Sequence, residues 1–143
     1  MSKESEERLA KLVSKVSLFS ELSRKDLRSI AKSGTERRFD AGQSIVKEGE
    51  TGVGFYLILE GRVEVRRKKR VLSTLSTGDF FGEMGLIDDQ PRSADVVAIS
   101  PTVTFALSPW TFGGIIRGNP DVAVGMMKVL VARLRATNRA LSE

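Results

Sequence analysis

The feature that most constrains the fold is a series of short β-rich segments, separated by glycines, between Thr35 and about Pro109. The segments recur every eight to twelve residues or so, a spacing typical of antiparallel sandwiches and barrels. Glycines fall in the breaks, where a turn can require a positive φ that costs glycine little. The expected strands are 36–39, 44–47, 55–60, 62–66, 71–75, 93–98 and 102–107.

Helical patterns flank this region on both sides. Before it, apolar residues recur at helical spacing, and Ser23 with Asp26 predicts the start of a second helix that Gly34 closes. After it, 110–117 predicts a short helix and 122–141 a long one, since the latter has no proline and a single glycine. A chain of 143 residues without a repeat or linker is expected to form one domain: helices over 1–34, the β region over 35–109, and helices over 110–143.

The absence of two residue types excludes much catalytic chemistry. With no cysteine the chain has no disulfide, zinc–thiolate site, iron–sulfur cluster or thiol nucleophile. With no histidine it has no Ser–His–Asp triad and no imidazole metal site. Carboxylates could still bind Mg²⁺ or Ca²⁺, but Asp88 and Asp89 look like a polar turn without the partners for a full shell. We therefore expect no enzyme, no metal site and no cofactor.

One segment, residues 78–94, carries recognisable chemistry: Gly-Asp-Phe-Phe-Gly-Glu-Met-Gly-Leu-Ile-Asp-Asp-Gln-Pro-Arg-Ser-Ala. Gly82 allows the backbone to approach a ligand closely, and Glu83 opens a short helical turn whose free N–H groups would face an anion. Pro91 ends the segment and fixes Arg92 at the start of a strand. An arginine fork suits phosphate, and a carboxylate accepts from a sugar hydroxyl. A ligand with both phosphate and ribose would satisfy both side chains.

This segment closely resembles the phosphate-binding cassette of the cyclic nucleotide-binding domain family, with the cassette at 81–94. Stretches 48–52 and 56–65 look like the family's glycine-punctuated strands, and 16–30 is similar to its helical lead-in. The resemblance implies a mainly β fold, an eight-stranded antiparallel β-roll (jelly roll) with short N-terminal helices and a long C-terminal helix. The sequence departs from the family at Gly54, where relatives more often carry a polar or acidic residue; the resemblance places no ligand contact there.

The resemblance also assigns site residues. Arg92 should bind the exocyclic phosphate and Glu83 the ribose 2′-hydroxyl, although an isolated pair of this kind would more often be a structural salt bridge. Gly82 and the amides after Glu83 would complete the cradle. The other implied contacts are Met84 and Gly85 in the cradle, Ser93 and Ala94 beside the phosphate, and Val65, Leu72, Leu75 and Phe80 in the apolar part of the pocket.

The last helix bears on the choice of nucleotide. Cyclic AMP and cyclic GMP share the ribose and phosphate, so the cassette does not separate them. Residues 133–138 resemble the adenine-contacting region of catabolite-activator-type regulators. The resemblance therefore implies base contacts from Thr137 and Asn138 and favours cyclic AMP, with cyclic GMP still possible.

The same helix has an apolar stripe at alternating spacings of three and four residues. Its members are Met127, Leu130, Leu134, Thr137 and Leu141. Such spacing is typical of a coiled-coil seam, which would make a homodimer, but the stripe could equally pack on the chain's own β-roll. The sequence leaves both interpretations open.

We therefore expect a cytoplasmic regulatory module that binds a cyclic nucleotide and moves its last helix. The alternatives are a nucleotide-free interaction scaffold with a relic pocket, or the excised sensor of a channel or transcription regulator. The basic run 66–70, in a chain of net charge +5, predicts a solvated hairpin tip; its alternative is an electrostatic contact with an anionic partner. We expect neither specific DNA binding, since no recognition-helix pair is seen, nor a membrane span.

Overall fold

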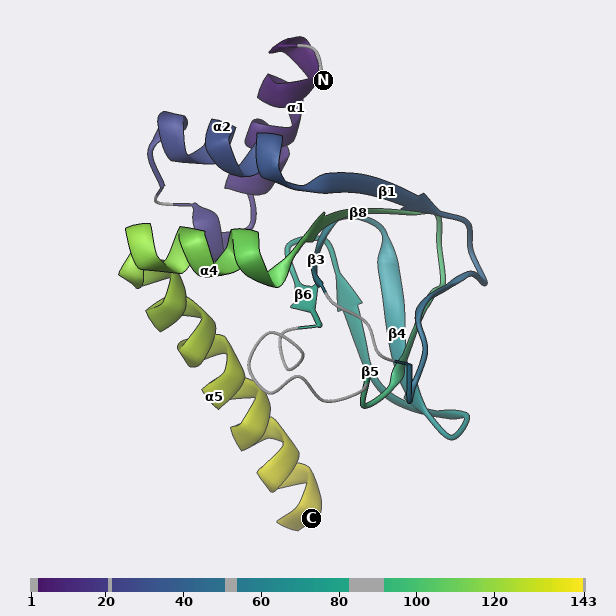
Figure 1. Ribbon diagram of the computed structural model, residues 1–143. Coiled ribbons are helices and arrows are strands. Elements are labelled where there is room, and N and C mark those ends of the chain that lie inside the picture. Colours follow the sequence, from purple (N-terminus) through teal and green to yellow (C-terminus); the bar gives the residue numbers. More distant parts are fainter. Residues whose placement is uncertain (1–2, 21, 51–53, 83–91, 143) are drawn as a thin grey trace.

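The computed structural model describes residues 3–20, 22–50, 54–82 and 92–142. Helices gather on one side of a β-roll, and the last helix runs along it to the C-terminus (Figure 1). The helices are α1 (Lys3–Ser14), η1 (Ser17–Phe19), α2 (Arg24–Ser33), α4 (Pro109–Gly118) and α5 (Pro120–Ser142). The strands are β1 (Thr35–Phe39), β2 (Ser44–Val46), β3 (Phe55–Glu60), β4 (Arg62–Arg67), β5 (Arg70–Ser76), β6 (Phe80–Phe81), β7 (Asp95–Ala98) and β8 (Thr102–Leu107).

The eight strands form two antiparallel four-stranded sheets, in the orders β1-β8-β3-β6 and β2-β7-β4-β5. This is the arrangement of a jelly roll, so the predicted fold class is confirmed. All seven strands predicted from the sequence are present, within two residues at either end. The eighth, β6, has only two residues and exists through its pairing with β3, where Leu57 lies opposite Phe80. A strand that short has no alternation pattern to detect.

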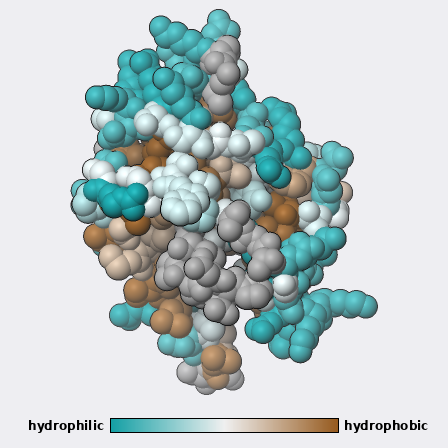
Figure 2. All heavy atoms as spheres, viewed as in Figure 1, coloured by the Kyte–Doolittle hydropathy of each residue, from teal (hydrophilic) through white to brown (hydrophobic). Residues whose placement is uncertain are grey.

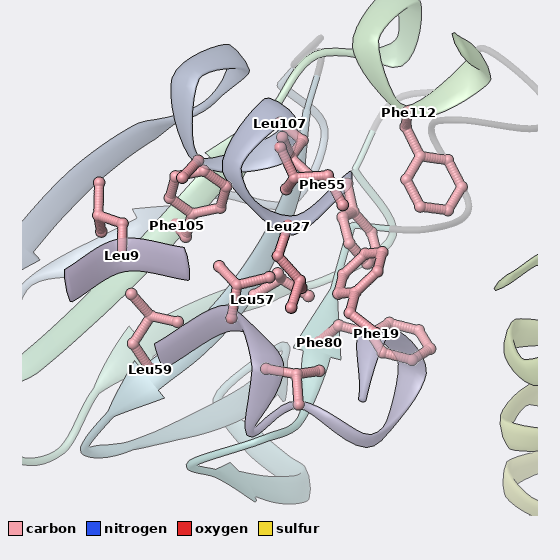
Figure 3. Close-up of a cluster of buried hydrophobic side chains, with 14 of the residues drawn as sticks. Leu9, Phe19, Leu27, Phe55, Leu57, Leu59, Phe80, Phe105, Leu107 and Phe112 are labelled. Atoms are coloured by element: carbon pink, nitrogen blue, oxygen red, sulfur yellow. The ribbon is translucent and has the colours of Figure 1, made fainter. Parts of the chain in front are cut away.

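Strand β3 is buried on both faces, which explains its unbroken apolar run. Phe55 and Leu57 point toward the helices, into a core that contains Phe19, Leu27 and Phe105 (Figure 3). The alternate residue Ile58 points into a second cluster between the two sheets. The two faces of β3 thus pack in two different hydrophobic clusters. The neighbouring β6 does the same, with Phe80 in the first cluster and Phe81 in the second.

The start and end of α2 follow from two local features. The Ser23 hydroxyl accepts a hydrogen bond from the Asp26 amide at 3.1 Å, which confirms the predicted N-cap. The helix ends before Gly34 as predicted, but the Gly34 backbone is extended and needs no left-handed conformation. Glycine is required there because a Cβ would lie 2.4 Å from the Phe105 ring. The chain thus passes from α2 into β1 directly over a core aromatic.

The basic run forms the tip of the β4–β5 hairpin, as predicted. Lys68 and Lys69 make the two-residue turn, with φ of 51° and 67°. Positive φ at both central positions suits the twist of a hairpin, but lysine adopts it at a cost that Asn-Gly largely avoids. In the part of the chain that the structure describes, no helix is long and apolar enough to cross a membrane.

Candidate functional site

The backbone of Arg92 is fixed by the turn that follows β2. The Arg92 amide donates to the Glu50 carbonyl at 3.0 Å, and the Gly49 amide donates to the Arg92 carbonyl at 2.9 Å. Nearby, the Glu48 amide donates to Asp95 Oδ1 at 2.6 Å. Two segments more than forty residues apart thereby form a short bridge just before β7. The base of the Arg92 side chain is held in place by this bridge.

The Arg92 side chain turns inward and is half-buried. Its Nη1 donates to the Gly54 carbonyl at 3.2 Å. Its Nε is buried and has no hydrogen-bond partner among the residues that the structure describes. A buried guanidinium donor without an acceptor is unfavourable, and an anionic oxygen would satisfy it with a charge-assisted hydrogen bond. The guanidinium therefore fits a phosphate.

Gly82 completes this arrangement. It has a φ of +88°, and a Cβ there would lie 2.6 Å from the Gly54 carbonyl oxygen and 3.0 Å from Arg92 Nη1. Only glycine can therefore bring the backbone this close to the guanidinium. Gly54 is thus the acceptor that orients Arg92. Sequence reasoning missed this role because 38 residues separate the two partners.

Several predicted cassette residues lie outside the described part of the chain. These are Glu83, Met84 and Gly85, so the structure says nothing of the predicted ribose contact or of a Glu83–Arg92 salt bridge. Of the two residues after Arg92, Ser93 is exposed and Ala94 is buried. Their contacts with a phosphate remain predictions.

The four apolar residues predicted to line the pocket do not share one environment. Val65 and Leu75 are partly buried and pack on the cluster between the sheets. Leu72 lies on the edge strand β5 and is 54% exposed. Phe80 is buried on the helix-facing side, with its ring 5.2 Å from that of Phe55. It is Phe81, which sequence reasoning passed over, that joins Val65 and Leu75 inside the roll.

Arg133 connects helix α5 to strand β6. Its Nη2 donates to the Phe80 carbonyl at 2.8 Å, and its guanidinium carbon lies 4.6 Å from the centre of the Phe80 ring. The predicted base contacts, Thr137 and Asn138, are both exposed, and the Thr137 hydroxyl donates to the Arg133 carbonyl at 3.1 Å. Arg133 was not predicted as a site residue. Its helical spacing from the inward-facing Met126 and Val129 is the signal that could have identified it.

Comparisons with known proteins agree with this geometry. The model of the family described as "Cyclic nucleotide-binding domain" matches residues 36–119. A cAMP-dependent protein kinase regulatory subunit of Yarrowia lipolytica is 35% identical over 116 residues, covering 81% of this chain and 31% of the relative. A cGMP-dependent protein kinase of Plasmodium berghei is 36% identical over 87 residues, covering 61% of this chain and 10% of the relative. The chain therefore spans less than a third of the length of either.

The comparison with solved structures gives the same result. The crystal structure of the Thermus thermophilus catabolite activator protein superposes with a TM-score of 0.78 at 32% identity, covering 87% of this chain and 61% of the other. The family model covers more than half of the chain and includes Gly54, Gly82 and Arg92. The chain therefore belongs to the cyclic nucleotide-binding domain family.

Proposed function

We propose that this chain is a cytoplasmic, non-catalytic sensor that binds a cyclic nucleotide, with cyclic AMP favoured, and transmits binding through α5. Membership of the family supports the general role of cyclic-nucleotide sensing. The observation that carries the site assignment is the half-buried Arg92 side chain, which donates to Gly54 beside the Gly82 backbone and whose buried Nε is left for an anion. The cyclic phosphate would occupy that position.

Two observations bear on the choice between cyclic AMP and cyclic GMP. Regulatory subunits of cAMP-dependent kinases are similar to this chain, but so are cGMP-dependent kinases. The resemblance of the segment around Thr137 and Asn138 to adenine-contacting regulators favours adenine. Both residues are exposed, so they are accessible to a ligand, and we propose that α5 closes over the base through them.

Arg133 gives α5 a physical connection to the site. Arg133 donates a hydrogen bond to the Phe80 carbonyl, two residues before Gly82, and lies over the Phe80 ring. A ligand that changes the conformation of the cassette would therefore change the geometry of this contact. A ligand shifts the helix only if it binds one helix position more tightly than the other. We propose that the Arg133–Phe80 contact couples the difference in ligand affinity to the position of α5.

The proposal is tested by isothermal titration calorimetry on protein stripped of nucleotide by unfolding and refolding. Cyclic AMP, cyclic GMP and 5′-AMP are titrated in turn. We expect cyclic AMP to bind at micromolar concentration or better, cyclic GMP more weakly, and 5′-AMP least, because its doubly charged, freely rotating phosphate does not match a cradle for one cyclic diester. Absence of binding by both cyclic nucleotides would leave the alternative of an interaction scaffold with a relic pocket.

A further inference from the structure

The net charge of the chain is concentrated in one turn. Residues 66–70, which we call the basic tip, are five consecutive cations at the end of the β4–β5 hairpin. Outside the basic tip the sequence has 18 basic and 18 acidic residues, so the tip accounts for the whole net charge of +5. The tip projects from the roll at the lower right of Figure 1, and Figure 2 shows hydrophilic side chains there. An anionic partner would therefore be attracted to this end of the molecule.

Four of the five cations are available to such a partner. Arg66 is engaged by Glu64, the single acidic residue of the two hairpin strands. Its Nε and Nη2 donate to Glu64 Oε1 at 2.9 and 2.6 Å. Residues 67–70 are exposed, and none of the ion pairs found among the described residues involves them. Within the described chain, four neighbouring positive charges thus have no counter-ion.

The backbone of the basic tip has a conformation that lysine does not favour. Lys68 and Lys69 have φ of 51° and 67°, a region that is sterically unfavourable for a residue with a long side chain. Asn-Gly is the common choice for such a two-residue turn. Strained backbone is found most often at functional sites, where a side chain serves a purpose other than stability. The two lysines therefore indicate that the charge of the tip has a function.

The residues that follow the tip favour a lipid surface over a nucleic acid. Val71 and Leu72 are 49% and 54% exposed, beside the cations on the edge strand β5. Cations next to exposed aliphatic side chains suit the interface of an anionic bilayer, which offers both charge and apolar surface. Strands β4 and β5 contain no aromatic residue on which a single-stranded base could stack. A duplex backbone presents phosphates but no apolar surface to the two aliphatic side chains.

We propose that the basic tip binds the surface of membranes that contain anionic lipids. The four available cations lie over the lipid head groups, and Val71 and Leu72 contact the boundary of the acyl region. Each cation near such a surface raises the partition coefficient about fivefold, so four together raise it by several hundredfold. Binding of this strength is reversible and is weakened by salt. It requires no nucleotide and uses none of the residues assigned to the phosphate.

Cosedimentation of the whole chain with vesicles tests the proposal. We expect binding to vesicles of phosphatidylserine and phosphatidylcholine, little binding to phosphatidylcholine alone, and release in high salt. Lys68→Asn with Lys69→Gly, and Lys68→Ala with Lys69→Ala, should each lower the partition coefficient about 25-fold, because each pair removes two cations. The first pair relieves the strain of the turn and the second keeps it. An equal loss in both therefore reports charge and not altered stability.

The matched control removes two cations elsewhere. Arg24 and Lys25 are consecutive and exposed at the start of α2. Arg24→Gln with Lys25→Gln gives the same net charge as the tip variants and should bind vesicles as wild type does. Failure of wild type to bind phosphatidylserine vesicles would overturn the proposal. An equal loss in the α2 and tip variants would also overturn it, because only the net charge would then matter.

A further variant distinguishes a lipid surface from a nucleic acid. Val71→Thr with Leu72→Thr keeps every cation and suits a strand, but it removes apolar surface. It should weaken vesicle binding severalfold and leave the residual binding to duplex DNA unchanged. If this variant binds vesicles as wild type does, and the chain binds duplex DNA more tightly than vesicles at equal salt and phosphate concentration, the basic tip is a nucleic-acid contact and the proposal is wrong. Circular dichroism of each variant confirms that the fold is retained.

Discussion

At the residue scale, Gly82 is the position where the site depends most on the absence of a side chain. A Cβ there would meet the Gly54 carbonyl at 2.6 Å, in addition to the cost of a positive φ. Gly78 has a similar φ of +94°, but nothing lies within 4 Å of its Cβ position. Substitutions at the two glycines therefore distinguish the free-energy cost of a positive φ from that of a steric clash.

We predict that Gly82→Ala lowers the free energy of unfolding by about 3–4 kcal/mol and Gly78→Ala by about 1–2 kcal/mol. Denaturant unfolding of both variants measures the difference. Gly82→Ala should also weaken cyclic nucleotide binding, since its methyl group displaces the Arg92 guanidinium. Equal destabilisation by the two substitutions would mean that the close approach of Gly82 to Gly54 is not a constraint.

At the scale of elements, the β4–β5 hairpin carries avoidable backbone strain. Replacing Lys68 and Lys69 by Asn-Gly should raise the free energy of unfolding by about 1 kcal/mol or more, because those residues adopt positive φ readily. The Ala-Ala variant removes the same two charges but keeps the strain. Thermal unfolding of the two variants separates the effects. If Ala-Ala stabilises as much as Asn-Gly, charge repulsion at the tip is the cause instead.

The attachment of α5 to β6 is the second prediction at this scale. Arg133→Met keeps an aliphatic stem but removes the donor to the Phe80 carbonyl and the charge over its ring. We expect a loss of about 1–2 kcal/mol in the free energy of unfolding and faster hydrogen exchange of α5 amides. Arg135→Met, on the exposed side of the same helix, is the matched control. If the hydrogen exchange of α5 amides is unchanged in Arg133→Met, the Arg133–Phe80 contact does not transmit ligand binding to α5.

At the scale of the whole molecule, the elements that local pattern determines could be predicted from the sequence. Short β-rich runs between glycine breaks predicted seven strands, and the absence of proline and near absence of glycine predicted the long last helix. What local pattern cannot supply is long-range pairing. Strand β6 exists because Phe80 and Phe81 pair with β3, and Arg92 is oriented by Gly54, which lies far away in the sequence.

The two faces of α5 show a different limit. Its apolar residues support two overlapping stripes, and the sequence alone does not say which is inward. In the structure Val122 and Met126 are buried, and a Cβ on Gly125 would lie 3.2 Å from Leu18, so this face of α5 is the inward one. Leu130 then packs against the core, and Val131 lies on the exposed face of the helix.

Ligand binding should stabilise the entire domain, since a ligand that binds only the folded chain raises its free energy of unfolding. Cyclic AMP at a hundred times its dissociation constant is expected to add about 2.7 kcal/mol, seen as a rise in melting temperature. Adenosine, which lacks the phosphate, is the control and should produce little change. An equal rise with adenosine would place recognition on the base and sugar and away from Arg92.

The most direct test of the account is the affinity of Arg92→Leu for cyclic AMP, measured by calorimetry on stripped protein beside wild type. Arg24→Leu, an exposed arginine on α2, is the control for loss of charge. If the guanidinium binds the cyclic phosphate, Arg92→Leu should lose about 3–5 kcal/mol of binding free energy, a thousandfold or so in affinity, while Arg24→Leu binds as wild type does. Wild-type affinity in folded Arg92→Leu would contradict the assignment of the site.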